Sequence, residues 1–102
     1  MNQYEWGVLF YMALSFDLSG YTGLMLTFTK PDGTVMTRTN PQVVMGTTEI
    51  TTTLGTLAPN TWVSYTFANG EVDQSGVWSV RLTYNDASRQ LISDPATFTL
   101  AA

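Results

Sequence analysis

The sequence predicts an all-β fold, an antiparallel β-sandwich of about 7–8 strands in a single domain over residues 1–102. Three observations predict it. The strand-forming residues Thr, Val, Tyr, Phe and Trp dominate the chain. Turn residues interrupt them about every ten residues, as they do in sandwiches and barrels. No window shows the apolar stripe and the capping residues of a helix.

Two strands are expected in the N-terminal third of the chain. Residues 4–14 form the first strand, which is apolar on both faces for much of its length. The turn at residues 17–20 follows, because Asp offers a side-chain acceptor to the local backbone and Gly adopts positive φ. Residues 22–30 alternate with a period of two, which predicts a second strand with one face in the core. Its core-facing residues are Leu24, Leu26 and Phe28.

The clearest turn of the chain is Pro31-Asp32-Gly33. Proline presets φ for the first corner of the turn, and Gly33 accepts a positive φ after it. The turn joins residues 22–30 to a third expected strand at residues 34–38, so these two strands should pair antiparallel as a hairpin.

The middle of the chain predicts a loop and then a Thr-rich strand. Residues 40–48 form the loop, within which residues 43–45 are either a short edge strand or a segment tucked under the sandwich. Residues 49–57 form the strand, favoured by β-branched threonines. Its expected core contacts are Ile50 and Leu54.

The C-terminal half predicts four further strands, at residues 61–67, 77–85, 89–92 and 97–100. The second of these has the most regular alternation and is expected to be a central strand. The residues expected on the core faces of the three longer strands are Val63, Tyr65, Phe67, Trp78, Val80, Leu82, Tyr84, Phe98 and Leu100.

A structural corner is expected where the strand at residues 77–85 begins. Immunoglobulin-type sandwiches often place an Asp, a Gly and then an aromatic residue at the start of a central strand. Asp73, Gly76 and Trp78 fill these places, with the Asp side chain expected to bond nearby backbone. Val80 stands where antibody-type domains have their second Cys, so apolar packing would close the core. The predicted sandwich is therefore immunoglobulin-like.

These segments also carry a family resemblance. Residues 17–20, 30–34 and 70–78 come in the order and spacing seen in small proteins of tailed bacteriophages. They resemble the N-terminal immunoglobulin-like domain of phage baseplate upper proteins, over roughly residues 15–100. The resemblance implies a virion structural role in the tail, the baseplate or the attachment of fibres, and it brings no catalytic residues. Baseplate upper proteins normally continue into a longer helical region that these residues do not include.

Charge and composition argue against several classes of function. Charged residues make up 12% of the chain, against about a quarter in average proteins, and the net charge is −4. The few cations are scattered, so no nucleic-acid partner is expected. The apolar run at residues 8–14 is too short to cross a bilayer, so no membrane insertion is expected. The chain has neither Cys nor His, which removes the commonest ligands of zinc and similar metals. A calcium site at Asp73, Asp86 or Asp94 would need a denser acidic spacing, so no metal site and no cofactor are expected.

The same composition predicts that the protein is not an enzyme. Nucleophilic catalysis by Ser or Thr would need a lysine partner, and Lys30, the sole lysine, is expected to be solvated at its turn. Glu71 and Asp73 are close enough in sequence to flank a glycosidic bond. They are better explained as corner and turn residues.

The function expected from these observations is binding to other proteins. The candidate interface consists of Trp6, Leu9 and Phe10, because an exposed apolar strand needs a cover. The expected partners are other virion structural proteins, with the chain present as a homo-oligomer or in many copies. The protein would be made in the bacterial cytoplasm and reside in the virion. The alternatives are a capsid decoration protein, or a receptor- or glycan-binding module at a fibre tip. Aromatic rings that could stack sugars if exposed on one face are those of Tyr4, Trp6, Tyr11, Tyr21 and Trp62.

Overall fold

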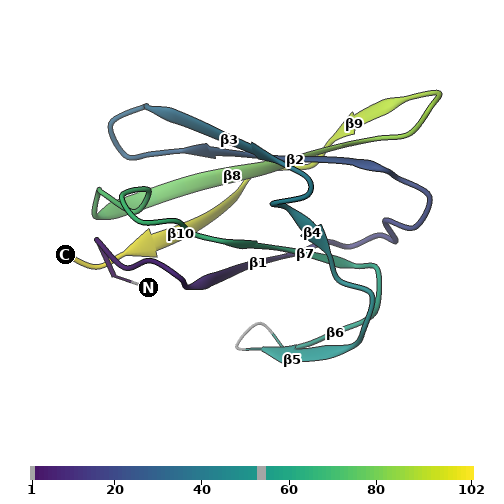
Figure 1. The fold of residues 1–102 in the computed structure, drawn as a ribbon, viewed down its shortest axis with the longest axis horizontal. Helices are drawn as coiled ribbons and strands as arrows, with labels where there is room; N and C mark the ends of the chain where they lie inside the picture. Colours follow the sequence, from purple (N-terminus) through teal and green to yellow (C-terminus); the bar gives the residue numbers. More distant parts are fainter. Residues whose placement is uncertain (1, 53–54) are drawn as a thin grey trace.

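The computed structural model describes residues 2–52 and 55–102, and in these ranges the chain forms strands and no helix (Figure 1). All pairs of strands are antiparallel, which confirms the predicted all-β antiparallel fold. The strands are β1 (Leu9–Ala13), β2 (Gly23–Thr29), β3 (Val35–Thr39), β4 (Val44–Met45), β5 (Ile50–Thr52), β6 (Gly55–Leu57), β7 (Trp62–Thr66), β8 (Gly76–Asn85), β9 (Gln90–Ile92) and β10 (Ala96–Leu100).

Two sheets enclose the core. The larger sheet has the order β10-β8-β2-β3, with β9 also pairing with β8, and the smaller has the order β1-β7-β4. The two sheets form two layers in Figure 1, and the β5–β6 hairpin lies on the side of the smaller sheet that faces away from the larger one. The core between the layers contains, among others, Met12, Leu24, Leu26, Phe28, Val63, Tyr65, Phe67, Trp78, Val80, Leu82 and Leu100.

The two predicted central elements form as the alternation requires. In β8 every second residue from Trp78 to Tyr84 is buried, and β8 has β2 on one side and both β9 and β10 on the other. The β2–β3 hairpin closes through Pro31-Asp32-Gly33, with Gly33 at a φ of 89°. The period-two alternation of apolar residues therefore predicts correctly which residues of the larger sheet face the core.

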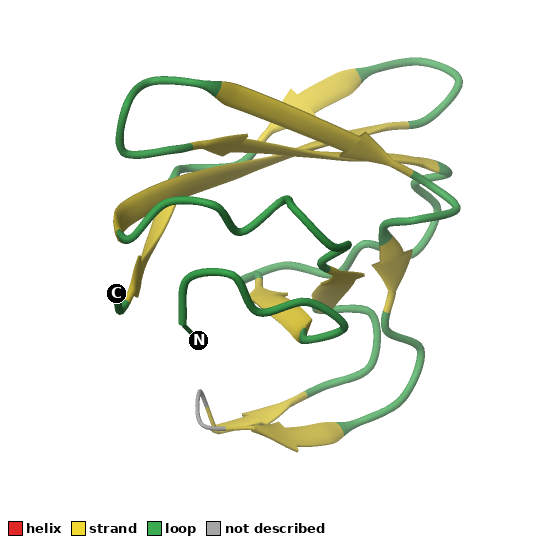
Figure 2. Ribbon diagram, turned by 60° about the vertical axis from the view of Figure 1, so that its left-hand side comes forward, coloured by secondary structure: helices red, strands yellow, loops and turns green. Residues whose placement is uncertain are grey.

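The predicted first strand over residues 4–14 is wrong in its first half, because only β1 is a strand. Tyr4 and Gly7 have φ values of 70° and 73°, which an extended strand cannot contain. The backbone before β1 instead bonds across the end of the sandwich (Figure 2). The amides of Gln3, Tyr4 and Gly7 donate to the carbonyl oxygens of Ala101, Val72 and Phe67, respectively.

The single strand predicted for residues 49–57 is also wrong, because this segment folds back on itself as the β5–β6 hairpin. Of its two predicted core contacts, Ile50 is half-buried, and Leu54 lies outside the described residues. The open choice for residues 43–45 resolves as an edge strand, with β4 pairing with β7 while Val43 is buried in the core.

Trp62 in the smaller sheet packs against the segment that leads into the β5–β6 hairpin. It lies in β7 beside the core residue Val63 and so faces the opposite side of the sheet. Its Nε1 donates a hydrogen bond of 2.9 Å to the carbonyl oxygen of Thr48, and only 8% of the residue is exposed. Its ring packs so closely on Gly46 that a Cβ there would lie 1.9 Å from ring carbon Cε2. The outer side of the smaller sheet is thus partly covered.

Candidate functional site

The predicted turn and the predicted corner, far apart in sequence, lie against each other. The backbone amide of Asp32 donates to Oε1 of Gln74 over 3.2 Å. Gly76 has a φ of 116°, and a Cβ on it would lie 3.2 Å from Cγ of Pro31. Gly76 is therefore required both for its backbone conformation and for the close approach of the turn.

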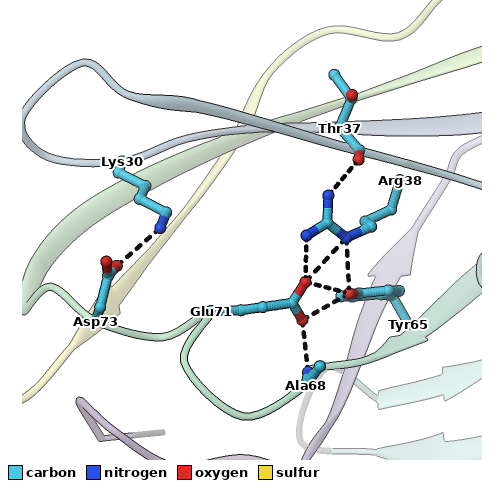
Figure 3. Close-up of polar contacts among 7 residues, drawn as sticks. All are labelled: Lys30, Thr37, Arg38, Tyr65, Ala68, Glu71 and Asp73. Carbon is cyan, nitrogen blue, oxygen red and sulfur yellow. Dashed lines mark hydrogen bonds and ion pairs between the residues drawn. The ribbon is translucent and has the colours of Figure 1, made fainter.

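The corner residues Asp73 and Trp78 are joined by Lys30, which was expected to be solvated. The Lys30 side chain is only 10% exposed, and its Nζ lies 2.8 Å from Oδ1 of Asp73 (Figure 3). The same Nζ lies 5.4 Å from the centre of the Trp78 ring, within the range of a cation–π contact. The expectation of an exposed Lys30 is wrong, because the β2 end at which it sits packs on the corner.

Trp78 is the buried centre of the corner, as the sequence predicts. The residue is fully buried, and its Nε1 donates a 3.0 Å hydrogen bond to the carbonyl oxygen of Gln74. Asp73, expected to bond nearby backbone, instead pairs through Oδ1 with Lys30. A local side-chain-to-backbone bond is made by Asp32 in the turn, whose Oδ1 accepts the amide of Thr34. Hydrogen bonds from Thr34, then from Gln74, lower the pKa of Asp32 to about 2.

Glu71 is the most fully engaged carboxylate described (Figure 3). It accepts hydrogen bonds from the hydroxyl of Tyr65, the backbone amide of Ala68, and Nε and Nη2 of Arg38. Partial burial disfavours its charged form, but the bonds from Tyr65, Ala68 and Arg38 outweigh burial and lower the pKa of Glu71. This cluster ties β3 and β7 to the segment before the corner.

The sequence points to Glu71 but not to its partners Arg38 and Tyr65. Arg38 lies 33 residues from Glu71 in the chain, and the alternation around Tyr65 indicates only that its ring faces the core. The oxygens of Glu71 accept bonds from Arg38 and Tyr65, and Oδ1 of Asp73 is paired with Lys30. We call the cluster of Glu71, Arg38 and Tyr65 the clamp, because it holds β3 and β7 to the segment before the corner.

The three candidate interface residues occupy different environments. Trp6 and Leu9 are 63% and 48% exposed, as an uncovered surface requires. Phe10 is half-buried, and its ring lies 5.4 Å from that of Phe28 and 5.0 Å from that of Phe98. Phe10 thus belongs mainly to the inner side of β1, which follows from the period of two.

An apolar groove runs between β1 and β10, the edge strands that end the two sheets on this side. Its volume is about 250 Å³. Neither strand contains a charged residue. The residues that line the groove are Phe10, Tyr11, Met12, Ala13, Val80, Ala96, Thr97 and Phe98. The open edges and the groove offer a surface suited to an extended, uncharged segment.

The outer face of the larger sheet is rich in threonine. Register places Thr27 beside Thr37 and Arg81, and Thr29 beside Ser79. At the next step along the sheet Met25 lies between Thr39 and Thr83. This face therefore presents hydroxyl and methyl groups with little charge.

Of the aromatic residues considered for sugar stacking, Tyr4 and Trp6 are exposed, whereas Tyr11 is half-buried. Trp62 is buried, with its Nε1 bonded to the carbonyl oxygen of Thr48. Tyr21 is half-buried, contacts the Tyr84 ring edge-on at 4.9 Å, and accepts a hydrogen bond from Arg89.

No protein-family model matches the sequence, and no curated protein or solved structure matches it at a significant level. Across the described ranges, no group of three or more acidic side chains is placed to hold a metal ion. The described part of the chain also contains no helix with the length and apolar character needed to span a membrane.

Proposed function

We propose that this chain is a structural protein of a tailed bacteriophage virion that works by packing against other virion proteins. The family resemblance of residues 17–20, 30–34 and 70–78 supplies the setting. The observation that carries the mechanism is the uncovered apolar surface formed by Trp6, Leu9 and the open edge of β1. Such a surface marks a binding site or an aggregation hazard in an isolated chain.

The immunoglobulin-like assignment belongs to the same proposal. In antibody-type domains one sheet contains strands B, E and D, and the other contains G, F, C and C′. The orders β1-β7-β4 and β10-β8-β2-β3 support this reading, with β8 as strand F. The bond from Trp78 to the carbonyl of Gln74 also supports it, because the tyrosine corner of these domains bonds upstream backbone in the same way.

The mechanism proposed is association without chemistry. A surface of threonine and apolar side chains loses little hydration energy when it is covered, because few charges have to be desolvated. The clamp around Glu71 and the corner at Trp78 keep the sandwich rigid while its edges are covered. The location favoured is the tail, baseplate or fibre-attachment region, with capsid decoration as the alternative.

The test is to purify the phage particles that encode this chain and to detect it with a specific antibody. We expect the chain to stay with intact particles through a density gradient and to be labelled at the tail end by immunogold electron microscopy. Label spread over the head would favour capsid decoration. A chain that is abundant in the lysate but absent from the particles would contradict the proposal.

The glycan-binding alternative has a weaker basis. Tyr4 and Trp6 are exposed, but Trp62 is buried and Tyr21 is engaged with Tyr84 and Arg89. A glycan array distinguishes the two functions, and a specific hit abolished by Tyr21→Ala would support glycan binding. That the protein is not an enzyme stays a prediction, open to test by turnover assays on polysaccharide substrates.

A further inference from the structure

We infer that two copies of this chain pair through the open edges of β1, antiparallel and about a two-fold axis at Tyr11. The pairing would join the smaller sheets of both copies into one continuous sheet. The inference deepens the proposed function by naming one partner and its geometry, and it rests on that function only for the setting in which copies meet.

The backbone groups that face the open edge follow from the register of β1 with β7. Phe67 donates its amide to Val8, and Leu14 donates its amide to Thr61, so both ends of this stretch bond toward β7. In an antiparallel pair alternate residues bond to the same neighbour. Phe10 and Met12 therefore also bond toward β7. The amides and carbonyls of Leu9, Tyr11 and Ala13 point to the open edge.

The β1 edge lacks the features by which proteins usually protect an edge strand. Those features are charge, proline, a bulge or very short length. β1 has five residues, Leu9–Ala13, without charge, proline or glycine. Other described edges differ: β4, β5, β6 and β9 have only two or three residues each, and β3 contains Arg38. β10 follows Pro95 and is extended by the bridge from Asn2 to Ala101. The edge of β1 is the one best suited to pair with another strand.

A second copy fits this edge because the edge is complementary to itself. With Tyr11 on the axis, Leu9 of one copy lies opposite Ala13 of the other, which sets a large side chain against a small one. Phe10 lies opposite Met12 on the groove side. An uncharged edge cannot select a partner by opposite charge, and pairing with itself brings no like charges together.

The size of the edge predicts a weak dimer. Stable interfaces bury about 800 Å² per partner, and a five-residue strand edge provides only part of that area. Exposed Trp6 and Leu9 add apolar surface beside it. We therefore expect association that rises with concentration, which suits a protein held in many copies on one particle.

Cross-linking at the proposed axis tests the geometry. The chain contains no Cys, so Tyr11→Cys introduces one thiol per copy. The Cα atoms of a directly opposed, hydrogen-bonded pair are about 5.5 Å apart, which a disulfide spans. We expect a covalent dimer under mild oxidation. The matched control is Val44→Cys, a 52% exposed position on the opposite edge of the same sheet, and it should stay monomeric.

A charge series tests the register without cross-linking. In sedimentation experiments over a range of concentrations, Leu9→Lys alone should abolish the dimer seen for the unmodified chain. L9K/A13E should restore it, because each introduced lysine then faces an introduced glutamate of the other copy. L9K/A13K should stay monomeric. Thermal unfolding of each variant checks that it folds.

The inference is overturned if the unmodified chain sediments at 11.2 kDa at all concentrations. It is also overturned if both cysteine variants cross-link equally, or if L9K/A13E stays monomeric while folded. These outcomes leave the proposed function standing if the chain is found in particles. If the chain dimerises through β1 but is absent from particles, the proposed function is contradicted and the inferred dimer stands.

Discussion

At the scale of single residues, Glu71 shows how one carboxylate stabilises the fold. Its oxygens accept bonds from Tyr65, Ala68 and Arg38, and its side chain is only 10% exposed. Burial acts to lower the pKa of Arg38, but bonds to Glu71 and Tyr65 outweigh it and raise that pKa, so the pairing favours the charge that an arginine always has. The charged pair is favourable only while both members are present, since a lone buried charge is costly.

This network predicts a loss of stability in acid. The folded-state pKa of Glu71 lies below its ordinary value of 4.5, so the unfolded chain binds more protons and unfolding becomes easier as pH falls through 4.5 and below. Glu71→Gln should cost about 1–3 kcal/mol at pH 7 and should flatten this part of the pH profile. Urea unfolding from pH 7 to pH 3 measures both effects.

The control for this experiment is Glu49→Gln, which changes an exposed carboxylate outside the network. It should keep both the stability and the pH profile of the unmodified chain. A Glu71→Gln variant with an unchanged profile would mean that Glu71 is not the group that titrates.

At the scale of elements, alternation predicts the larger sheet and β7, but it fails for residues 4–14 and 49–57. The β2–β3 hairpin and β8 follow directly from period-two patterns and from a Pro-Asp-Gly turn. Residues 4–14 mislead because they are apolar for much of their length, and composition does not reveal the positive φ of Tyr4. Residues 49–57 mislead because β-branching favours a strand but does not say where it reverses.

The candidate site, too, is predictable from the sequence only in part. The turn at Asp32 and the corner at Trp78 were predictable because each has a local signature. Their contact through Lys30, and the clamp of Arg38 on Glu71, were not predictable because the partners meet only in the folded chain. Local chemistry is visible in one sequence, whereas pairings between distant segments are not.

The prediction at this scale concerns the contact between Trp62 in β7 and Gly46, which lies in the segment that leads into the β5–β6 hairpin. Gly46→Ala would place a Cβ 1.9 Å from Cε2 of Trp62, a rigid ring that cannot rotate away while bonded to Thr48. Overpacking of this kind costs about 1–3 kcal/mol. We expect a lower midpoint of thermal unfolding and a red shift of tryptophan emission. The neighbouring Thr47→Ala, at an exposed position, should change neither.

At the scale of the whole molecule, the side of the sandwich formed by the edges of β1 and β10 is closed at one end only. At that end the backbone of residues 2–8 bonds to Ala101 at the end of β10 and to Phe67 at the end of β7. Along the rest of that side the edges of β1 and β10 stay open around the groove. The N-terminal segment thus closes the end of the core and leaves the strand edge for a partner.

This division predicts which amides outside the strands are protected from hydrogen exchange. The amides of Gln3, Tyr4 and Gly7 donate to the backbone of three other segments, so each should exchange at least about tenfold more slowly than in an unstructured peptide. Two-dimensional NMR in deuterated water measures each rate. Gly7→Pro removes one donor and forbids the φ of 73°, so it should release the segment and speed exchange at Gln3 and Tyr4. Exchange at peptide rates in the unmodified chain would mean that the segment is undocked. The core end beside Phe67 would then be as open as the β1 edge, and pairing would no longer be confined to Leu9–Ala13.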